Sequence, residues 1–127
     1  MIPINDYQTI VYNKLKETEY KVFDEVPQDE SLPVVMISDY VLAEGECKDE
    51  SYVIQQQIDI YSLYDGKKEV NEMVSVALSK IKELICTEIN DEYSIGYIML
   101  LESQITRLED GLYVGNLVFQ INIERVN

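Results

Sequence analysis

The 127-residue sequence predicts an α+β fold, with a single mostly antiparallel sheet and two helices packed on one of its faces. Three observations lead to this prediction. Segments 5–18 and 66–86 repeat apolar residues at helical spacing. Several other segments are rich in β-branched residues and are separated by turn signals. The chain shows no internal repeat or linker, so we expect one domain spanning 1–127.

The N-terminal part predicts a helix followed by two strands. "NDYQTIVYNKLKET" at 5–18 carries an apolar residue on each turn and begins with Asn and Asp, which cap helices. "KVFDEVP" predicts a short strand that Pro27 ends. The run "PVVMISDYVL" at 33–42 is nearly continuous in apolar residues, which is typical of a strand covered on both faces, at least along its first half.

The segment "SYVIQQQIDIYSLY" at 51–64 gives the clearest strand pattern. Isoleucines share one face, and amide or carboxylate side chains share the other: Ile54, Ile58 and Ile60 against Gln55, Gln57 and Asp59. The acidic loop "AEGECKDE" connects this strand to the preceding one. The two strands and their loop therefore predict a hairpin with an extended tip.

A long helix and a second hairpin complete the predicted fold. Asp65 and Gly66 end the strand and open a helix at 66–86, whose apolar residues form a continuous stripe. "EDG" at 109–111 signals a turn between a strand within "SIGYIMLLESQITRL" and a final strand within "YVGNLVFQINIERV". We expect the stripe to pack on the sheet, which gives this predicted core: Ile58, Ile60, Val70, Val74, Ala77, Ile81, Ile85, Phe119 and Ile121.

The composition is strongly acidic. The chain has 24 Asp and Glu against ten Lys and Arg, for a net charge of −14. Such a chain repels phosphate backbones, so we expect no specific or sequence-independent nucleic-acid binding. Solubility explains the acidic residues most simply. The alternative is a surface that must not adhere to nucleic acid.

The sequence offers few groups that perform chemistry. It contains no His, which excludes a Ser-His-Asp or Cys-His site within one chain. Neither phosphate-binding glycine loop is present, and the acidic loops "INDEYS" and "GECKDES" lack the spacing of a calcium loop. Cys47 and Cys86 are expected to be free thiols, with Cys86 half-buried. We therefore expect no enzyme activity, no metal and no other cofactor.

No segment suggests a membrane location. The apolar runs are too short to cross a bilayer, and "MIPINDYQTI" lacks the basic and apolar regions of a signal peptide. We expect synthesis in the cytoplasm and no membrane partner.

The chain also contains ten tyrosines. We expect some of them, such as Tyr7, Tyr12 and Tyr61, to be half-buried, with the ring packed and the hydroxyl in water. Tyrosine is enriched at protein interfaces, so the excess favours an oligomer mildly.

Three segments form an ordered series: "VFDEVPQDESLPVVMISD" at 22–39, "IQQQIDIYSLYDGKKEVNEMVSVALSKI" at 54–81 and "EDGLYVGNLVFQINIE" at 109–124. The series resembles, over nearly the whole chain, the small tail-completion or tail-terminator proteins of long-tailed phages and prophages. Members follow an N-terminal helix with "V-[YF]-D-x-x-P" and "LPYVV" strands, a strand ending in "VWS", a helix and a closing hairpin. No single motif is specific, and the order carries the resemblance. This chain has "IYS" in place of "VWS" and is more acidic than most members.

The resemblance implies a structural virion protein that forms a ring, commonly a hexamer, which caps the tail tube and joins it to the head. The implied partners are further copies of the chain, the tail-tube protein and a neck or head-completion protein, in a virion made in the cytoplasm of a bacterial host. DNA would pass through the ring, and the acidic turn at Asp29 and Glu30 would face outward. The tip of the first hairpin would contact a neighbouring subunit, through Glu44, Glu46, Lys48, Asp49 and Glu50.

Two other classes of function remain open at this stage. An adaptor or regulatory binding module would share the α+β fold without forming a ring. A small hydrolase is the weakest candidate, because the chain lacks His. The sequence leaves open the ring size, the face that meets the tube or the head, the neighbours in the tail, and whether the source is an active phage or a decayed prophage.

Overall fold

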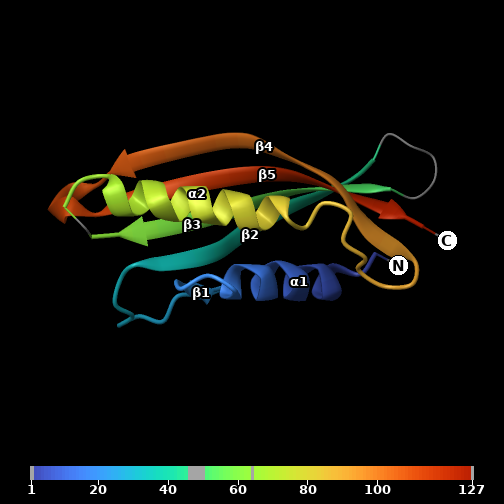
Figure 1. The fold of residues 1–127 in the computed structure, drawn as a ribbon, viewed down its shortest axis with the longest axis horizontal. Coiled ribbons are helices and arrows are strands. Elements are labelled where there is room, and N and C mark those ends of the chain that lie inside the picture. The colour runs from blue at the N-terminus through green and yellow to red at the C-terminus, as the bar shows by residue number, and fades with distance from the viewer. Residues whose placement is uncertain (1, 46–50, 64, 127) are drawn as a thin grey trace.

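The computed structural model describes residues 2–45, 51–63 and 65–126, and it confirms the predicted α+β class. Two helices and five strands follow one another as Figure 1 shows. The helices are α1 (Ile4–Lys16) and α2 (Lys68–Lys82). The strands are β1 (Lys21–Phe23), β2 (Val34–Glu44), β3 (Tyr52–Ser62), β4 (Tyr93–Arg107) and β5 (Tyr113–Arg125), and the short 3-10 helix η1 (Glu109–Gly111) joins the last two.

The strands form one sheet in the order β1-β2-β3-β5-β4. The short β1 runs parallel to β2, and the other three neighbouring pairs are antiparallel. Both helices lie on the same face of the sheet: α2 runs along β3 and β5, and α1 lies beside α2 and β1 (Figure 1). The opposite face carries no helix of the described residues.

Helix α2 is shorter than the sequence predicts: it spans Lys68–Lys82 rather than 66–86. It begins after Gly66, whose positive φ of 81° reverses the chain, and the last turn carries Lys80 and Lys82, which favour the negative end of the helix dipole. After Lys82 the chain tightens and reaches Cys86 at a φ of 66°, a left-handed conformation that continues no helix. The prediction that Cys86 is half-buried is wrong, since the turn leaves this residue exposed.

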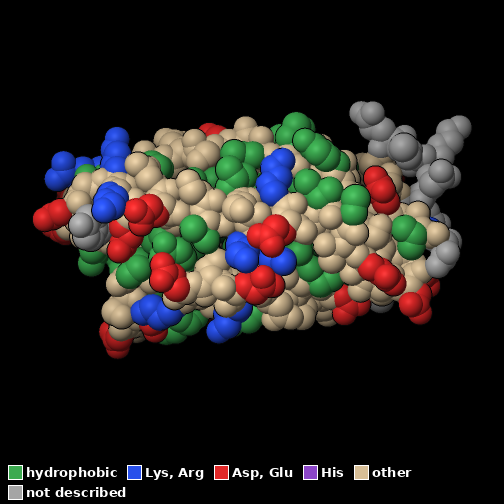
Figure 2. All heavy atoms as spheres, viewed as in Figure 1, with side chains coloured by type: hydrophobic (Ala, Val, Ile, Leu, Met, Phe, Trp, Pro, Cys, Tyr) green, Lys and Arg blue, Asp and Glu red, His purple; other side chains and the backbone are tan. Residues whose placement is uncertain are grey.

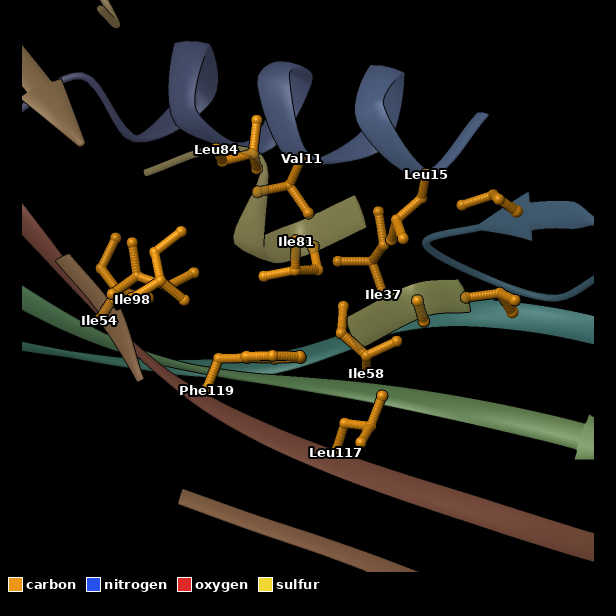
Figure 3. Close-up of a cluster of buried hydrophobic side chains, with 14 of the residues drawn as sticks. Val11, Leu15, Ile37, Ile54, Ile58, Ile81, Leu84, Ile98, Leu117 and Phe119 are labelled. Carbon is orange, nitrogen blue, oxygen red and sulfur yellow. The ribbon is translucent and has the colours of Figure 1, made fainter. Parts of the chain in front are cut away.

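The core lies between the helices and the sheet. Figure 3 shows Val11 and Leu15 of α1 and Ile81 of α2 directed toward Ile58, Leu117 and Phe119 of the sheet. Most of the residues predicted for the core are buried: Ile58, Ile60, Val70, Ala77, Ile81, Phe119 and Ile121. Val74 and Ile85 are partly buried and pack against the same cluster.

One polar pair is sealed inside this core. Tyr7 of α1 is 1% exposed, and its hydroxyl donates a hydrogen bond of 3.0 Å to Oε1 of Gln56, which is itself fully buried. The side-chain amide of Gln56 donates to the carbonyl of Ser38 at 3.2 Å, where β2 has a bulge. The prediction that the Tyr7 hydroxyl lies in water is therefore wrong. The Gln56 amide ties α1, β3 and the bulge of β2 together.

Replacing Ile81 with Ala tests the helix–sheet core. The side chain is fully buried, so we expect Ile81→Ala to lower the free energy of unfolding by about 2–5 kcal/mol. The exposed Ser75 on the same helix supplies the control, and Ser75→Ala should stay within about 0.5 kcal/mol of the wild type. Urea denaturation measures both. Equal stability of the two variants would contradict this account of the core.

Removing the Tyr7 hydroxyl tests the buried pair. Tyr7→Phe leaves Oε1 of Gln56 buried without its donor, which costs about 1–3 kcal/mol. Burial raises the pKa of Tyr7 above its ordinary value of 10.0, so the folded protein keeps a proton that the unfolded chain loses. This contribution to stability is complete below pH 10.0 and declines above it. The stability of Tyr7→Phe should fall less steeply with alkaline pH than that of the wild type.

Urea denaturation between neutral and alkaline pH measures this difference. Tyr12→Phe, on the partly exposed side of the same helix, is the matched control and should follow the wild type. Parallel pH profiles for Tyr7→Phe and the wild type would contradict the burial of this hydroxyl.

Candidate assembly surfaces

A cluster of hydrogen-bonded polar side chains lies at the centre of the helix-free face of the sheet. Asp59 on β3 is only 5% exposed, although no helix covers this face. Its Oδ1 accepts hydrogen bonds from the side-chain amides of Gln57 at 2.9 Å and Asn116 at 2.6 Å. Asn116 lies directly opposite Asp59 in the β3–β5 pair, so the sheet register sets this contact. The resulting surface is fixed in shape and offers amide groups rather than cations.

Positive charge is distributed unevenly between the two faces. The four long strands, β2 to β5, contain only two basic residues, Arg107 and Arg125, and each is the last residue of its strand. The remaining basic residues of the described chain lie on α1, on β1, or on and just before α2. Figure 2 shows the helix side, where Lys and Arg side chains are interleaved with Asp and Glu. The sheet itself therefore offers very little to attract a phosphate.

Two lysines on the helix side form ion pairs that join α1 and α2. Glu17, just after α1, contacts Lys14 at 3.3 Å and Lys80 of α2 at 3.4 Å. Glu83 contacts the same two lysines, at 3.7 Å each. Hydrogen bonds from Lys14 and Lys80 hold the pKa of Glu17 below its usual value. These exposed pairs position the two helices and contribute little stability each.

Strand β2 has two halves of different character. Its first half is buried, as predicted, whereas Tyr40, Val41 and Leu42 beyond the bulge are exposed, Val41 by 63%. This distal half extends with β3 past the helices as an arm (Figure 1). Of the residues predicted for the subunit-contact hairpin, Glu44 lies exposed at the end of β2. Glu46, Lys48, Asp49 and Glu50 lie outside the described residues.

Strand β4 forms the other edge of the sheet, since β5 is its only neighbour among the paired strands. Tyr97, Met99 and Leu101 are exposed along it, Tyr97 by 57%. The Lys82 ammonium lies 5.2 Å from the centre of the Tyr97 ring and donates to the carbonyl of Ile98 at 2.6 Å. Lys82 thus occupies one backbone acceptor of this edge, the carbonyl of Ile98.

An open groove lies between α1 and the first two strands. It has a volume of about 920 Å³, and its lining includes Tyr12 of α1, Phe23 of β1 and Tyr40 of β2. The described residues contain no group of three or more His, Cys, Asp or Glu that could hold a metal ion. In the described chain, no helix combines the length and apolarity needed to cross a membrane.

The acidic turn between β1 and β2 is fastened to the sheet. The Lys21 ammonium contacts Oε1 of Glu30 at 2.5 Å and donates to the hydroxyl of Ser31 at 2.9 Å. Asp29 is exposed, whereas Glu30 is partly covered by its contact with Lys21. Only part of this turn is therefore free to face outward.

Sequence reasoning missed the two open strand edges as surfaces. The exposed apolar residues of β2 and β4 lie in segments that the sequence marks only as strands. The dense apolar run "YIMLL" at 97–101 is a signal that could have found the β4 surface, because a half-covered strand alternates polar with apolar residues.

Comparison with known proteins gives one informative result. No protein-family model matches the sequence, and no curated protein matches it. The structure is similar to a chain of a solved structure, the virion of the native gene transfer agent (GTA) particle, with a TM-score of 0.71. The match covers 92% of this chain and 93% of that one, at 18% sequence identity. The two chains therefore share the same fold over nearly their whole lengths.

Proposed function

We propose that this protein is a structural component of a virion, and that it acts as a tail terminator. The observation that carries the proposal is the likeness in fold, over nearly the whole length, to a chain of the native GTA virion. The ordered motifs that resemble tail-terminator proteins support the same position in a particle. In this role the protein forms a ring that caps the tail tube and joins it to the head through a neck protein. It acts by binding alone, without catalysis.

A terminator needs a passage that DNA can cross without adhering. In our proposal the helix-free face of the sheet lines this passage. The four long strands carry basic residues only at their ends, and the centre of the face offers Gln57, Asn116 and the buried Asp59. Such a surface attracts no phosphates, whereas the helix side holds most of the cations of the described chain.

Deleting the gene from a producing phage tests the terminator role. We expect filled heads without tails, together with headless tails that are often overlong, because nothing stops subunit addition at the tube end. Purified protein added back should restore joining at one ring per particle. Electron microscopy and plaque counts measure both effects. Normal infectious particles after the deletion would refute the role and favour the adaptor function.

Adding cations to the helix-free face tests the proposed passage. Gln57→Lys with Gln120→Lys places two ammonium groups on neighbouring strands of this face. We expect complete particles that deliver DNA several-fold less efficiently, and purified protein that binds short duplexes in a salt-dependent manner. Asn71→Lys with Ser75→Lys adds the same charge to the exposed side of α2 and is the matched control. Equal DNA delivery by the two double variants would place the passage elsewhere.

A further inference from the structure

We propose that copies of this protein join edge to edge, with the distal half of β2 in one copy pairing antiparallel with the second half of β4 in the next copy. The partner is a second copy of this chain, and the contact would extend the sheet from one subunit into the next. This inference rests on the ring of the proposed function and names the residues that would build it.

The first open edge lies on β2. Strand β1 pairs with β2 only from Val34 to Met36, and no described strand covers the outer side of β2 beyond the bulge. At the end of β2 the Gly45 N–H donates to the carbonyl of Ser51 at 2.8 Å, so the alternation of an antiparallel pair directs the backbone groups of Tyr40, Leu42 and Glu44 away from β3. These groups are ready to pair with another strand.

The second open edge lies on β4, and only part of it is protected. In its first part, the Ile95 N–H donates to the carbonyl of Thr87 at 2.7 Å, and the Ile98 carbonyl accepts from Lys82. Past Ile98, no described segment pairs with its outer side. Leu108 donates its N–H to Leu112, so alternation directs the backbone groups of Ser103, Ile105 and Arg107 outward. Proteins normally protect open sheet edges from pairing, and on β4 this protection ends at Ile98.

Exposed apolar residues gather at these two edges. Nine large apolar side chains are exposed in the described chain, and six of them lie on the two strands: Tyr40, Val41, Leu42, Tyr97, Met99 and Leu101. The β2 edge carries Asp39 and Glu44 and no basic residue, whereas the second half of β4 carries Glu102 and Arg107 and is followed by Glu109 and Asp110. All six apolar residues except Tyr97 lie in the open stretches, so a second copy covers apolar surface on both edges.

The topology permits this contact to repeat around a ring. Three antiparallel pairs separate β2 from β4, so the two strands run in opposite directions within one subunit. Rotation about a ring axis that runs along the strands does not change the direction of any strand. It therefore places β4 of one copy antiparallel to β2 of the next copy. Such a head-to-tail contact uses two different surfaces, and it forms a ring when the rotation between neighbouring copies closes.

The two open stretches are also offset along the strands. Tyr40 is aligned with Leu100 across the sheet, through the cross-strand partners Gln56 and Phe119. From this level, the open stretch of β2 extends toward one end of the sheet and the open stretch of β4 extends toward the other end. Pairing them shifts each copy along its neighbour and tilts the strands against the ring axis. Closing a sheet into a barrel requires such a tilt.

Proline substitutions test the two edges separately. Leu42→Pro and Ser103→Pro each remove an N–H that points away from the sheet, so each variant should keep its fold and its melting temperature. The wild type should form rings as its concentration rises in analytical ultracentrifugation, whereas each variant alone should remain a monomer. An equimolar mixture of the two should give dimers and no rings, because only one intact contact is possible between them.

A matched control and a second pair of variants complete the experiment. Leu63→Lys changes an apolar residue that is 57% exposed and lies on neither edge, and it should assemble like the wild type. Should either proline variant unfold, Leu42→Lys and Leu101→Lys replace side chains on the same edges and should give the same monomers and mixed dimers. Rings that persist in both single-edge variants, or a wild type that is monomeric up to its solubility limit, would overturn the inference.

The same variants distinguish this inference from the proposed function. Variants that assemble and cap tails like the wild type would leave the terminator role intact and refute the edge contact. Variants that lose their rings, together with normal particles after gene deletion, would support the edge contact and refute the terminator role.

Discussion

The buried amide of Gln56 is the constraint on which the arrangement of this protein depends. It accepts from the Tyr7 hydroxyl and donates to the carbonyl of Ser38, so a single side chain fixes α1, β3 and the β2 bulge relative to one another. An apolar residue at this position would leave the Tyr7 hydroxyl buried without its acceptor, at a cost of about 1–3 kcal/mol. The bulge in turn divides β2 into a half that belongs to the core and a half that extends beyond it.

The placement of both helices on one face determines what each remaining surface can do. Burial against α1 and α2 uses the isoleucines of the sheet, and the other face carries amides such as Gln57 and Asn116 beside valines such as Val114 and Val118. There the Gln57–Asp59–Asn116 contacts satisfy the one buried carboxylate of the described residues without help from a cation. The centre of this face is thus ordered without positive charge, and the large apolar side chains that remain exposed lie mainly at the edges of the sheet.

The sequence predicts the fold class well because helices and strands here carry regular patterns. The stripe of α2 and the alternation of β3 are local properties, and they place Ile81 and Ile58 correctly in the core. Gln56 shares the isoleucine face of β3, yet its burial depends on Tyr7, a partner 49 residues away. The open edges likewise depend on the order of strands in the sheet, and no local pattern encodes that order. The apolar stripe predicts the wrong exposure for Cys86, because the left-handed turn at this residue follows a helix that ends before the stripe does.

The position of α1 ahead of the sheet in the sequence has a consequence for synthesis. This 13-residue helix is synthesised before the sheet, yet it packs against β1, which follows it closely, and against α2, which is made much later. Helices shorter than about 12–15 residues are marginal in water, so α1 gains a firm structure only when its partners arrive. The Tyr7 hydroxyl therefore exchanges its hydrating water for Gln56 only after β3 has been translated. Until then a nascent chain exposes Val11 and Leu15, two side chains that the finished protein buries completely or nearly so.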